Sequence, residues 1–191
     1  MNSIHQKILI ITAPSGAGKT SITRHLMKVF PVLEFSVSAA TRNPRGIEKN
    51  GLDYYFIGLE DFKQKIQNKE FAEWEMVYEG KYYGTLKSEL KRIWALNKIP
   101  VLDIDVKGAI HIQQQYPENT LSLFIEPPSV NELKNRLEGR GTETAESLSA
   151  RINKATYELS FKDQFNHLII NEDLQHACAA AEKVVAEFIN E

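Results

Sequence analysis

Near the start of the chain stand Ala13-Pro14-Ser15-Gly16-Ala17-Gly18-Lys19-Thr20, directly after the apolar run Lys7-Ile8-Leu9-Ile10-Ile11-Thr12. The apolar run predicts a buried strand, and the next segment, 21–30, carries apolar residues at helical spacing. A strand, a glycine-bearing loop ending in Gly-Lys-Thr and a helix are typical of a loop that binds phosphate groups. Inward-pointing backbone N–H groups and the N-terminus of the helix attract phosphate oxygens there. The sequence therefore predicts a site for a nucleoside triphosphate.

Two side chains of this loop have expected roles. Lys19 is expected to reach the outer phosphates, and the Thr20 hydroxyl to bind Mg²⁺. The usual pattern begins with glycine, where this chain has Ala13. If that position needs a left-handed backbone, alanine costs about 1–2 kcal/mol there. An ordinary strand-to-helix turn that happens to contain Gly-Lys-Thr is the alternative interpretation.

Composition limits the class of protein. The chain has 191 residues, 42% hydrophobic and 25% charged, which predicts one globular domain with a substantial core. The net charge of −2 argues against a general nucleic-acid-binding protein. No apolar run approaches a membrane span and residues 1–6 do not resemble a signal peptide, so we expect a cytoplasmic protein without a membrane partner. The single cysteine, Cys178, is expected in the core, and the five histidines lack metal-ligand spacing.

Strand and helix patterns alternate along the rest of the chain. Further buried strands are predicted at Ile99–Val106, Leu121–Ile125 and His167–Asn171. Helical patterns cover Ser88–Leu96, Gly108–Gln115, Ser129–Arg140, Glu146–Leu159 and Gln175–Ile189. This alternation predicts an α/β fold with a mostly parallel sheet, whose ligands bind beyond the carboxyl ends of the strands.

Two polar segments interrupt this core, which we expect to comprise residues 1–33, 88–126 and 162–191. The first, 34–87, has short apolar runs and predicts a small mixed insertion. The second, 127–161, is expected to be helical, and Ser129 with Glu132 predicts a capping box at its start. Arg136 and Arg140 then share one helix face, and Arg151 follows on the next helix.

Charged residues near strand ends suggest chemistry. Asp103 and Asp105 lie near the end of a predicted strand, and we expect Asp103 to act as a water-mediated ligand of Mg²⁺ and Asp105 to face a second substrate. The alternative interpretation is that both carboxylates are simply exposed to solvent at the end of the strand. Arg42 and Arg45, in a proline-containing loop, are expected to grip a phosphate group.

Several motifs in order along the chain resemble those of guanylate kinases. They are the phosphate loop, Ser36-Val37-Ser38, Thr41-Arg42-x-Pro44-Arg45, Gly51-x-Asp53-Tyr54, Glu70-Phe71-x-Glu73, Tyr82-Tyr83-Gly84-Thr85, Leu102-Asp103-Ile104-Asp105, Arg136-Leu137-x-Gly139-Arg140-Gly141 and Ile170-Asn171-Glu172-Asp173. The resemblance covers essentially the whole chain. It implies the fold of the P-loop nucleoside monophosphate kinases and phosphoryl transfer from ATP to GMP with Mg²⁺. It also implies a core, a GMP-binding insertion at 34–87 and a mobile lid at 127–161.

The resemblance also implies roles for individual residues. The loop residues 13–20 and an adenine contact from Asn171 would bind ATP. The GMP phosphate would be held by Arg42, Arg45, Tyr54 and Tyr83. The guanine base would be read by Ser38, Glu73, Thr85 and Asp105, with Glu48 in the same pocket. Catalysis would involve Lys19, Arg42 and the lid arginines Arg136, Arg140 and Arg151.

The chemistry of guanine favours Glu73 as the residue that reads the base. Guanine presents two adjacent donors, N1–H and the exocyclic amine, and one carboxylate can accept both. The hydroxyls of Ser38 and Thr85 can donate to O6. Adenine would set an acceptor against the carboxylate, and a site with unpaired polar groups discriminates by about 10⁴–10⁵. The segment 74–83 contains four aromatic residues. Of these only Tyr83 is expected to contact phosphate, while Trp74, Tyr78 and Tyr82 are expected to pack.

Four departures from the family pattern remove no group that the chemistry requires. They are Ala13, the early glycine Gly46, a stretch at Glu75–Gly80 one residue longer than in some members, and Lys107 in place of glutamine. A non-catalytic interaction module of the same fold and a kinase for another nucleoside monophosphate are the rival functions at this point. Use of dGMP and the oligomeric state also stay open.

Overall fold

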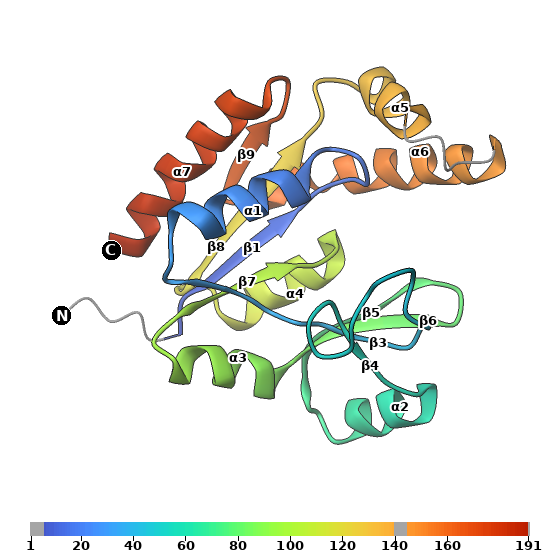
Figure 1. Ribbon diagram of the computed structural model, residues 1–191, viewed down its shortest axis with the longest axis vertical. Helices are drawn as coiled ribbons and strands as arrows, with labels where there is room; N and C mark the ends of the chain where they lie inside the picture. The colour runs from blue at the N-terminus through green and yellow to red at the C-terminus, as the bar shows by residue number, and fades with distance from the viewer. Residues whose placement is uncertain (1–5, 140–144, 191) are drawn as a thin grey trace.

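The computed structural model describes residues 6–139 and 145–190 (Figure 1). Its central element is a five-stranded parallel sheet of order β2-β7-β1-β8-β9. The strands are β2 (Leu33–Phe35), β7 (Ile99–Asp103), β1 (Ile8–Thr12), β8 (Thr120–Glu126) and β9 (His167–Ile170). Helices α1 (Lys19–Val29) and α7 (Leu174–Asn190) cover one face, and α3 (Lys87–Ala95) and α4 (Val106–Gln115) cover the other. The predicted α/β fold is confirmed.

The central strand β1 shows why this sheet is buried on both sides. Leu9 and Ile11 pack into the cluster that contains α1 and α7. Ile8 and Ile10 pack into the cluster that contains α3 and α4. Because successive side chains of a strand point to opposite faces, a strand covered on both faces reads as an unbroken apolar run. The strand predicted here is therefore correct. The phosphate loop follows directly after its carboxyl end and lies at that edge of the sheet.

The strand predicted at Ile99–Val106 is too long. The strand β7 ends at Asp103, and Asp105 has left the sheet to become the N-cap of α4. The Asp105 side chain accepts a hydrogen bond of 2.9 Å from the backbone N–H of Gly108, which satisfies one of the free donors at the helix start. The helix α4 consequently begins at Val106, two residues before the predicted start, and the two aspartates do not lie on one strand face.

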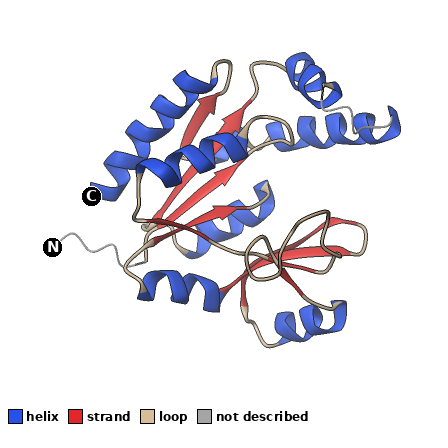
Figure 2. Ribbon diagram, in the orientation of Figure 1, coloured by secondary structure: helices blue, strands red, loops and turns tan. Residues whose placement is uncertain are grey.

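A smaller sheet lies beside the first and has the order β4-β3-β6-β5 (Figure 2). It consists of β4 (Tyr55–Phe56), β3 (Ala39–Ala40), β6 (Lys81–Leu86) and β5 (Phe71–Tyr78). Pairing is antiparallel between β3 and β6 and between β6 and β5, and parallel between β3 and β4. Helix α2 (Leu59–Gln67) closes its core with Phe62, which is fully buried against Phe71 and Tyr82.

The chain enters this smaller sheet after β2. Leu33, Glu34 and Phe35 pair with β7 in the five-stranded sheet, close to the predicted start of the insertion at about residue 34. β2 is three residues long, too short for its sequence pattern to identify it.

Helices α5 (Val130–Glu138) and α6 (Ala145–Leu159) lie beyond the carboxyl ends of β1 and β8 (Figure 1). They pack on each other through Leu133, Leu137 and Ala155. The Ser129 hydroxyl accepts a 3.0 Å hydrogen bond from the Glu132 N–H, as predicted for the N-cap. The Glu132 carboxylate turns to Arg136 instead of completing the predicted box.

Two predictions made from composition can be compared with the structure. Cys178 is buried in the core between α7 and the sheet, as predicted. Within 6–139 and 145–190, no helix combines the length and the apolar character that crossing a bilayer requires.

The smaller sheet depends on the packing of Phe62. Its ring is fully buried, with its centroid 4.4 Å from that of Phe71. We predict that Phe62→Ala lowers the free energy of unfolding by about 3–5 kcal/mol, because it leaves a cavity in a small core. Urea unfolding followed by circular dichroism measures this. Phe62→Leu is the matched control and should lose less than half as much; equal losses for the two variants would contradict the packing argument.

Candidate active site

A cleft of about 430 Å³ opens beyond the carboxyl ends of β1 and β7, with the smaller sheet and α6 on its other sides. Ligands of α/β sheets bind in crevices of this kind. Most residues that the sequence assigned to a nucleotide site line it: Ala13, Pro14, Ser15, Gly16, Gly18, Lys19, Thr20, Ser38, Arg42, Arg45, Tyr54, Glu73, Tyr83, Asp103, Asp105 and Arg151. The fold thus brings segments from across the chain to one candidate active site.

The phosphate loop needs glycine at two of its positions. Gly16 and Gly18 have φ angles of 96° and 97°, which only glycine adopts without strain. Ala13 is not among the described residues with a positive φ, so alanine carries no left-handed penalty there. A β-carbon at Gly16 would lie 3.0 Å from side-chain carbons of Leu133 and Leu137, so α5 packs directly on this loop.

Asn171 fixes the same loop from the end of β9. Its buried side-chain Nδ2 donates a 2.7 Å hydrogen bond to the carbonyl oxygen of Ala17. A β-carbon at Gly18 would lie 2.1 Å from this nitrogen. In this structure the Asn171 amide therefore contacts the loop backbone, although the sequence assigned it to the adenine base.

The first charged group of the cleft is Lys19, at the start of α1. Its ammonium group contacts the carboxylate of Asp103 at the end of β7. Thr20 follows on the helix and also lines the cleft. A cation, a hydroxyl and a carboxylate therefore gather where the phosphate loop ends.

Across the cleft, Glu73 on β5 is 6% exposed and stands opposite Thr85 on β6. The Thr85 hydroxyl donates a 2.6 Å hydrogen bond to Glu73 Oε1. Thr85 is fully buried, so its hydroxyl hydrogen holds the glutamate rather than pointing to a ligand. A β-carbon at Gly108 would lie 2.5 Å from Glu73 Oε2, so the glycine of α4 makes room for the carboxylate. Ser38 and Asp105 line the cleft nearby.

Burial dominates the electrostatics of Glu73. It raises the pKa of this carboxyl to about 7, and the negative charge of Asp105 adds to the effect while the Thr85 hydrogen bond opposes it. A large fraction of Glu73 is therefore protonated at neutral pH. Donors that hydrogen-bond to the carboxylate would favour its ionised form.

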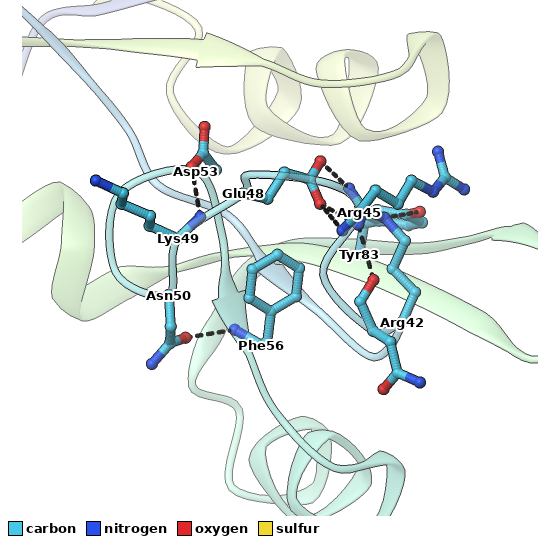
Figure 3. Close-up of polar contacts among 9 residues, drawn as sticks. Arg42, Arg45, Glu48, Lys49, Asn50, Asp53, Phe56 and Tyr83 are labelled. Carbon is cyan, nitrogen blue, oxygen red and sulfur yellow. Dashed lines mark hydrogen bonds and ion pairs between the residues drawn. The ribbon is translucent and has the colours of Figure 1, made fainter.

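A second group of polar residues surrounds Arg42, in the loop after β3 (Figure 3). Arg42 forms a two-point ion pair with Glu48 and donates a 3.1 Å hydrogen bond to the Tyr83 hydroxyl. Arg45 and Tyr54 lie in the same part of the cleft. The resemblance assigned Glu48 to the pocket for the guanine base. In this structure Glu48 instead pairs with Arg42, which the resemblance assigned to the GMP phosphate.

Two of the three predicted lid arginines, Arg151 and Arg136, have different partners in the described structure. Arg151 on α6 lines the cleft, and its Nη1 donates a 3.3 Å hydrogen bond to the Ser15 hydroxyl of the phosphate loop. Arg136 on α5 instead binds the Glu132 carboxylate and the backbone oxygen of Asn171. Arg140 lies outside the described residues.

The cleft lining also includes residues to which the sequence analysis gave no role, among them Glu75, Val77, Lys154 and Glu158. The first two alternate with Glu73 along β5, and the other two follow Arg151 at helical spacing along α6, so periodicity could have found them. Glu158 is 6% exposed, and its oxygen lies 3.7 Å from the ammonium nitrogen of Lys154. Burial raises the pKa of Glu158, while the charges of Lys154 and Lys19 lower it.

Comparison with known proteins adds to this geometry. The sequence model of the family described as "Guanylate kinase" matches residues 5–188. The guanylate kinase of Bacteroides fragilis is 48% identical over 183 residues, which are 96% of this chain and 90% of that protein. The guanylate kinase of Porphyromonas gingivalis is 43% identical over 184 residues, 96% of this chain and 98% of that protein.

A solved structure agrees with these relatives. The crystal structure of guanylate kinase from Anaplasma phagocytophilum superimposes with a TM-score of 0.78 at 28% identity. The superposition covers 98% of this chain and 87% of that chain. The likeness therefore extends over both sheets and the helical pair α5 and α6.

Glu73 makes the stability of the protein depend on pH. Its pKa is about 7 in the folded protein against 4.5 for the ordinary group, so the folded state holds the extra proton between these values. Stability therefore falls as pH rises through this window. Removing the carboxylate with Glu73→Gln should raise stability relative to the parent by about 2 kcal/mol more at about pH 8 than at about pH 5.

Urea unfolding of parent and variant at the two pH values measures this difference. Because both proteins share all other titrating groups, those contributions cancel. Glu60→Gln, a change on the exposed side of α2, is the control and should leave the difference near zero. A stability gain for Glu73→Gln that does not change with pH would contradict the raised pKa.

Proposed function

This chain belongs to the guanylate kinase family and is an enzyme that phosphorylates GMP, and we propose that it uses ATP as donor with Mg²⁺ in the cleft described above. The observation that carries the assignment of residues is that the phosphate loop and Glu73 face one cleft. A triphosphate on the loop and a monophosphate whose base reaches Glu73 would meet head to head. Transfer between them then requires no movement of an intermediate through the protein.

The donor end would use the loop at 13–20. Its backbone N–H groups, the positive end of α1 and the Lys19 ammonium together suit a polyphosphate. Lys19 would exchange its contact with Asp103 for the outer phosphates. Asn171, which supports the loop at Ala17, would keep the backbone in place around the phosphates.

The residues present fit Mg²⁺. Mg²⁺ prefers one or two protein oxygens completed by phosphates and water. The Thr20 hydroxyl and the Asp103 carboxylate both line the loop side of the cleft, and the described residues contain no cluster of three acidic, histidine or cysteine side chains that would form a full protein cage. We propose that Thr20 holds the ion directly and Asp103 through water. When bound, the ion neutralises charge on the phosphate oxygens.

The acceptor end would read guanine through Glu73. The N1–H and exocyclic amine of guanine can both donate to one carboxylate, which would then bind the base in its ionised form. Ser38 can donate to O6, and Asp105, at the start of α4, lies on the same side. Thr85 would act on the base through Glu73, which it orients. A base without the paired donors would leave a buried carboxylate unsatisfied, which is the source of selectivity.

Catalysis would consist of positioning and charge neutralisation. The acceptor is a phosphate oxygen that is already anionic, so the reaction requires no general base. Arg151 already reaches the phosphate loop at Ser15, and Arg136 and Arg140 would join it over the transferring group as the helices close. Arginines in that position contribute about 10³–10⁵ in rate. Closure of α5 and α6 would also exclude water from the γ-phosphate.

Specificity for the acceptor can be measured directly. We predict ADP formation from ATP with GMP and none above background with AMP, UMP or dTMP, because only guanine presents paired donors with an O6 acceptor. A coupled assay for ADP with each acceptor in turn measures this. Activity with another monophosphate would replace the substrate assignment, and no ADP with any acceptor would support a non-catalytic interaction module.

Substitution of Glu73 tests the base pocket. We predict that Glu73→Gln lowers kcat/KM for GMP by about 10²-fold, since one oxygen that accepts from guanine is replaced by an amide that donates. The KM for ATP should stay within about twofold because the change lies across the cleft from the loop. Glu75→Gln, the neighbouring carboxylate that lines the cleft, is the matched control. Equal losses for GMP and ATP would refute the proposed orientation of the base.

A further inference from the structure

Most of the donors of Arg42 are already occupied by the protein. A guanidinium has five N–H donors. In this structure Nε donates to the Tyr83 hydroxyl at 3.1 Å, and Nη1 donates to the Asn43 carbonyl at 3.0 Å and to Glu48 Oε2 at 2.5 Å. Nη2 donates to Glu48 Oε1 at 2.8 Å (Figure 3). These contacts use four of the five N–H groups, so that a single N–H of Nη2 remains beyond them.

Aromatic rings hold the same guanidinium in place. Its central carbon lies 4.8 Å from the ring centroid of Tyr54 and 5.5 Å from that of Phe56. The Arg42 side chain is only 7% exposed. A planar cation stacked on rings and paired with a carboxylate has little freedom to turn toward an incoming phosphate.

Glu48 is held as firmly as its partner. Its Oε2 accepts a 2.7 Å hydrogen bond from the backbone N–H of Arg45 in addition to the bond from Arg42. Residues 45–48 form a turn that directs the Glu48 side chain toward Arg42. The Glu48 backbone N–H donates a 3.1 Å hydrogen bond to the Arg45 carbonyl, and Gly46 in this turn has a φ of 55°. The Arg42 guanidinium lowers the pKa of Glu48 to about 2, so the carboxylate is ionised at all pH values at which the enzyme works.

The contacts that hold Arg42 also determine the orientation of the Tyr83 hydroxyl. Because its oxygen accepts from Arg42 Nε, the hydroxyl hydrogen is free to donate in another direction, and Tyr83 lines the cleft. A hydroxyl that accepts from a cation is also a stronger donor, since hydrogen bonds in a chain polarise one another. Arg42 therefore orients a neutral donor toward the place where a monophosphate would bind.

We propose that Glu48 is a positioning residue, which keeps its ion pair with Arg42 while GMP binds, so that the phosphate is met by the Tyr83 hydroxyl, by Arg45 and by the one remaining N–H of Arg42. The inference rests on the proposed function and refines it. In this arrangement Arg42 mainly orients Tyr83, and Arg45 provides most of the positive charge that contacts the phosphate. The glutamate assigned to the base pocket by resemblance instead acts at the phosphate end.

A competing arrangement makes the opposite prediction. If Glu48 were a stand-in for the phosphate that GMP displaces, breaking its ion pair would be part of binding. Removing the charge of Glu48 would then lower the KM for GMP. A positioning role requires the KM to rise, because Arg42 would turn and Tyr83 would lose its orientation.

Glu48→Gln separates the two arrangements. We predict that it raises the KM for GMP about tenfold, the effect of losing one charge-assisted contact. The kcat and the KM for ATP should stay within about twofold, because the loop does not touch the donor site. A fall in the KM for GMP, or no change in it, would overturn the proposal. Glu48→Asp, which keeps the charge on a shorter arm, should give an intermediate KM.

A double substitution tests whether the effect passes through Tyr83. In a Tyr83→Phe background the further effect of Glu48→Gln on the KM for GMP should fall below about threefold, since the two residues act on one contact. Independent, multiplying effects would show that Glu48 does not act through Tyr83. Asp53→Asn is the matched control: its carboxylate binds the Lys49 N–H at 2.7 Å in the same loop. It should leave the KM for GMP within about twofold.

These outcomes are distinct from failure of the proposed function. If the parent protein forms no ADP with GMP, the function itself is wrong and no variant is informative about Glu48. Thermal unfolding of each variant, measured alongside the kinetics, checks that the fold is retained. Glu48 is on a surface loop with its side chain 23% exposed, so its replacement does not open a core cavity.

Discussion

The left-handed backbone of the loop after β1 is the constraint on which the rest of the structure depends. Gly16 and Gly18 turn the chain so that its N–H groups point into the cleft. The space that side chains would occupy is filled by neighbours, the leucines of α5 at Gly16 and the amide of Asn171 at Gly18. One turn therefore connects the central strand, the helical pair and the end of β9. A side chain at Gly16 would press on α5, and one at Gly18 would displace the Asn171 amide.

Around this loop, several cations of the cleft are already paired with acids. Lys19 contacts Asp103, Arg42 pairs with Glu48, and Lys154 lies near Glu158. Pairing allows cations to stand close together in an empty protein, where their mutual repulsion would otherwise oppose folding. An incoming nucleotide then meets charges whose positions are already fixed, which reduces the ordering that binding must supply. Lys19 would be released to its ligand, whereas Arg42 would stay with its partner.

The sequence predicted those structural features that are formed by consecutive residues of the chain. Strand β1, the phosphate loop and α1 follow one another without a gap, and their pattern identifies both fold and nucleotide site. Contacts between distant segments could not be predicted this way. Arg136 binds the Asn171 backbone and Asn171 binds Ala17 across the fold, so a motif that names these residues does not reveal what each one touches. The prediction placed Asp105 within a strand, whereas it is the N-cap of α4. The sequence signals for the strand and for the helix cap overlap at the end of β7.

The two glutamates of the acceptor site show how one cleft assigns different tasks to the same side chain. Burial raises the pKa of Glu73, because desolvation disfavours the charged form and the single hydrogen bond from the Thr85 hydroxyl offsets only part of this effect. Arg42 lowers the pKa of Glu48, which already accepts three hydrogen bonds from Arg42 and the Arg45 backbone. The first carboxylate gains most from a ligand with paired N–H groups, and a wrong base leaves it unsatisfied. The second gains nothing from a ligand and can only hold others in place. In the proposed arrangement, selectivity for the base would therefore depend on Glu73, and alignment of the phosphate contacts on Glu48.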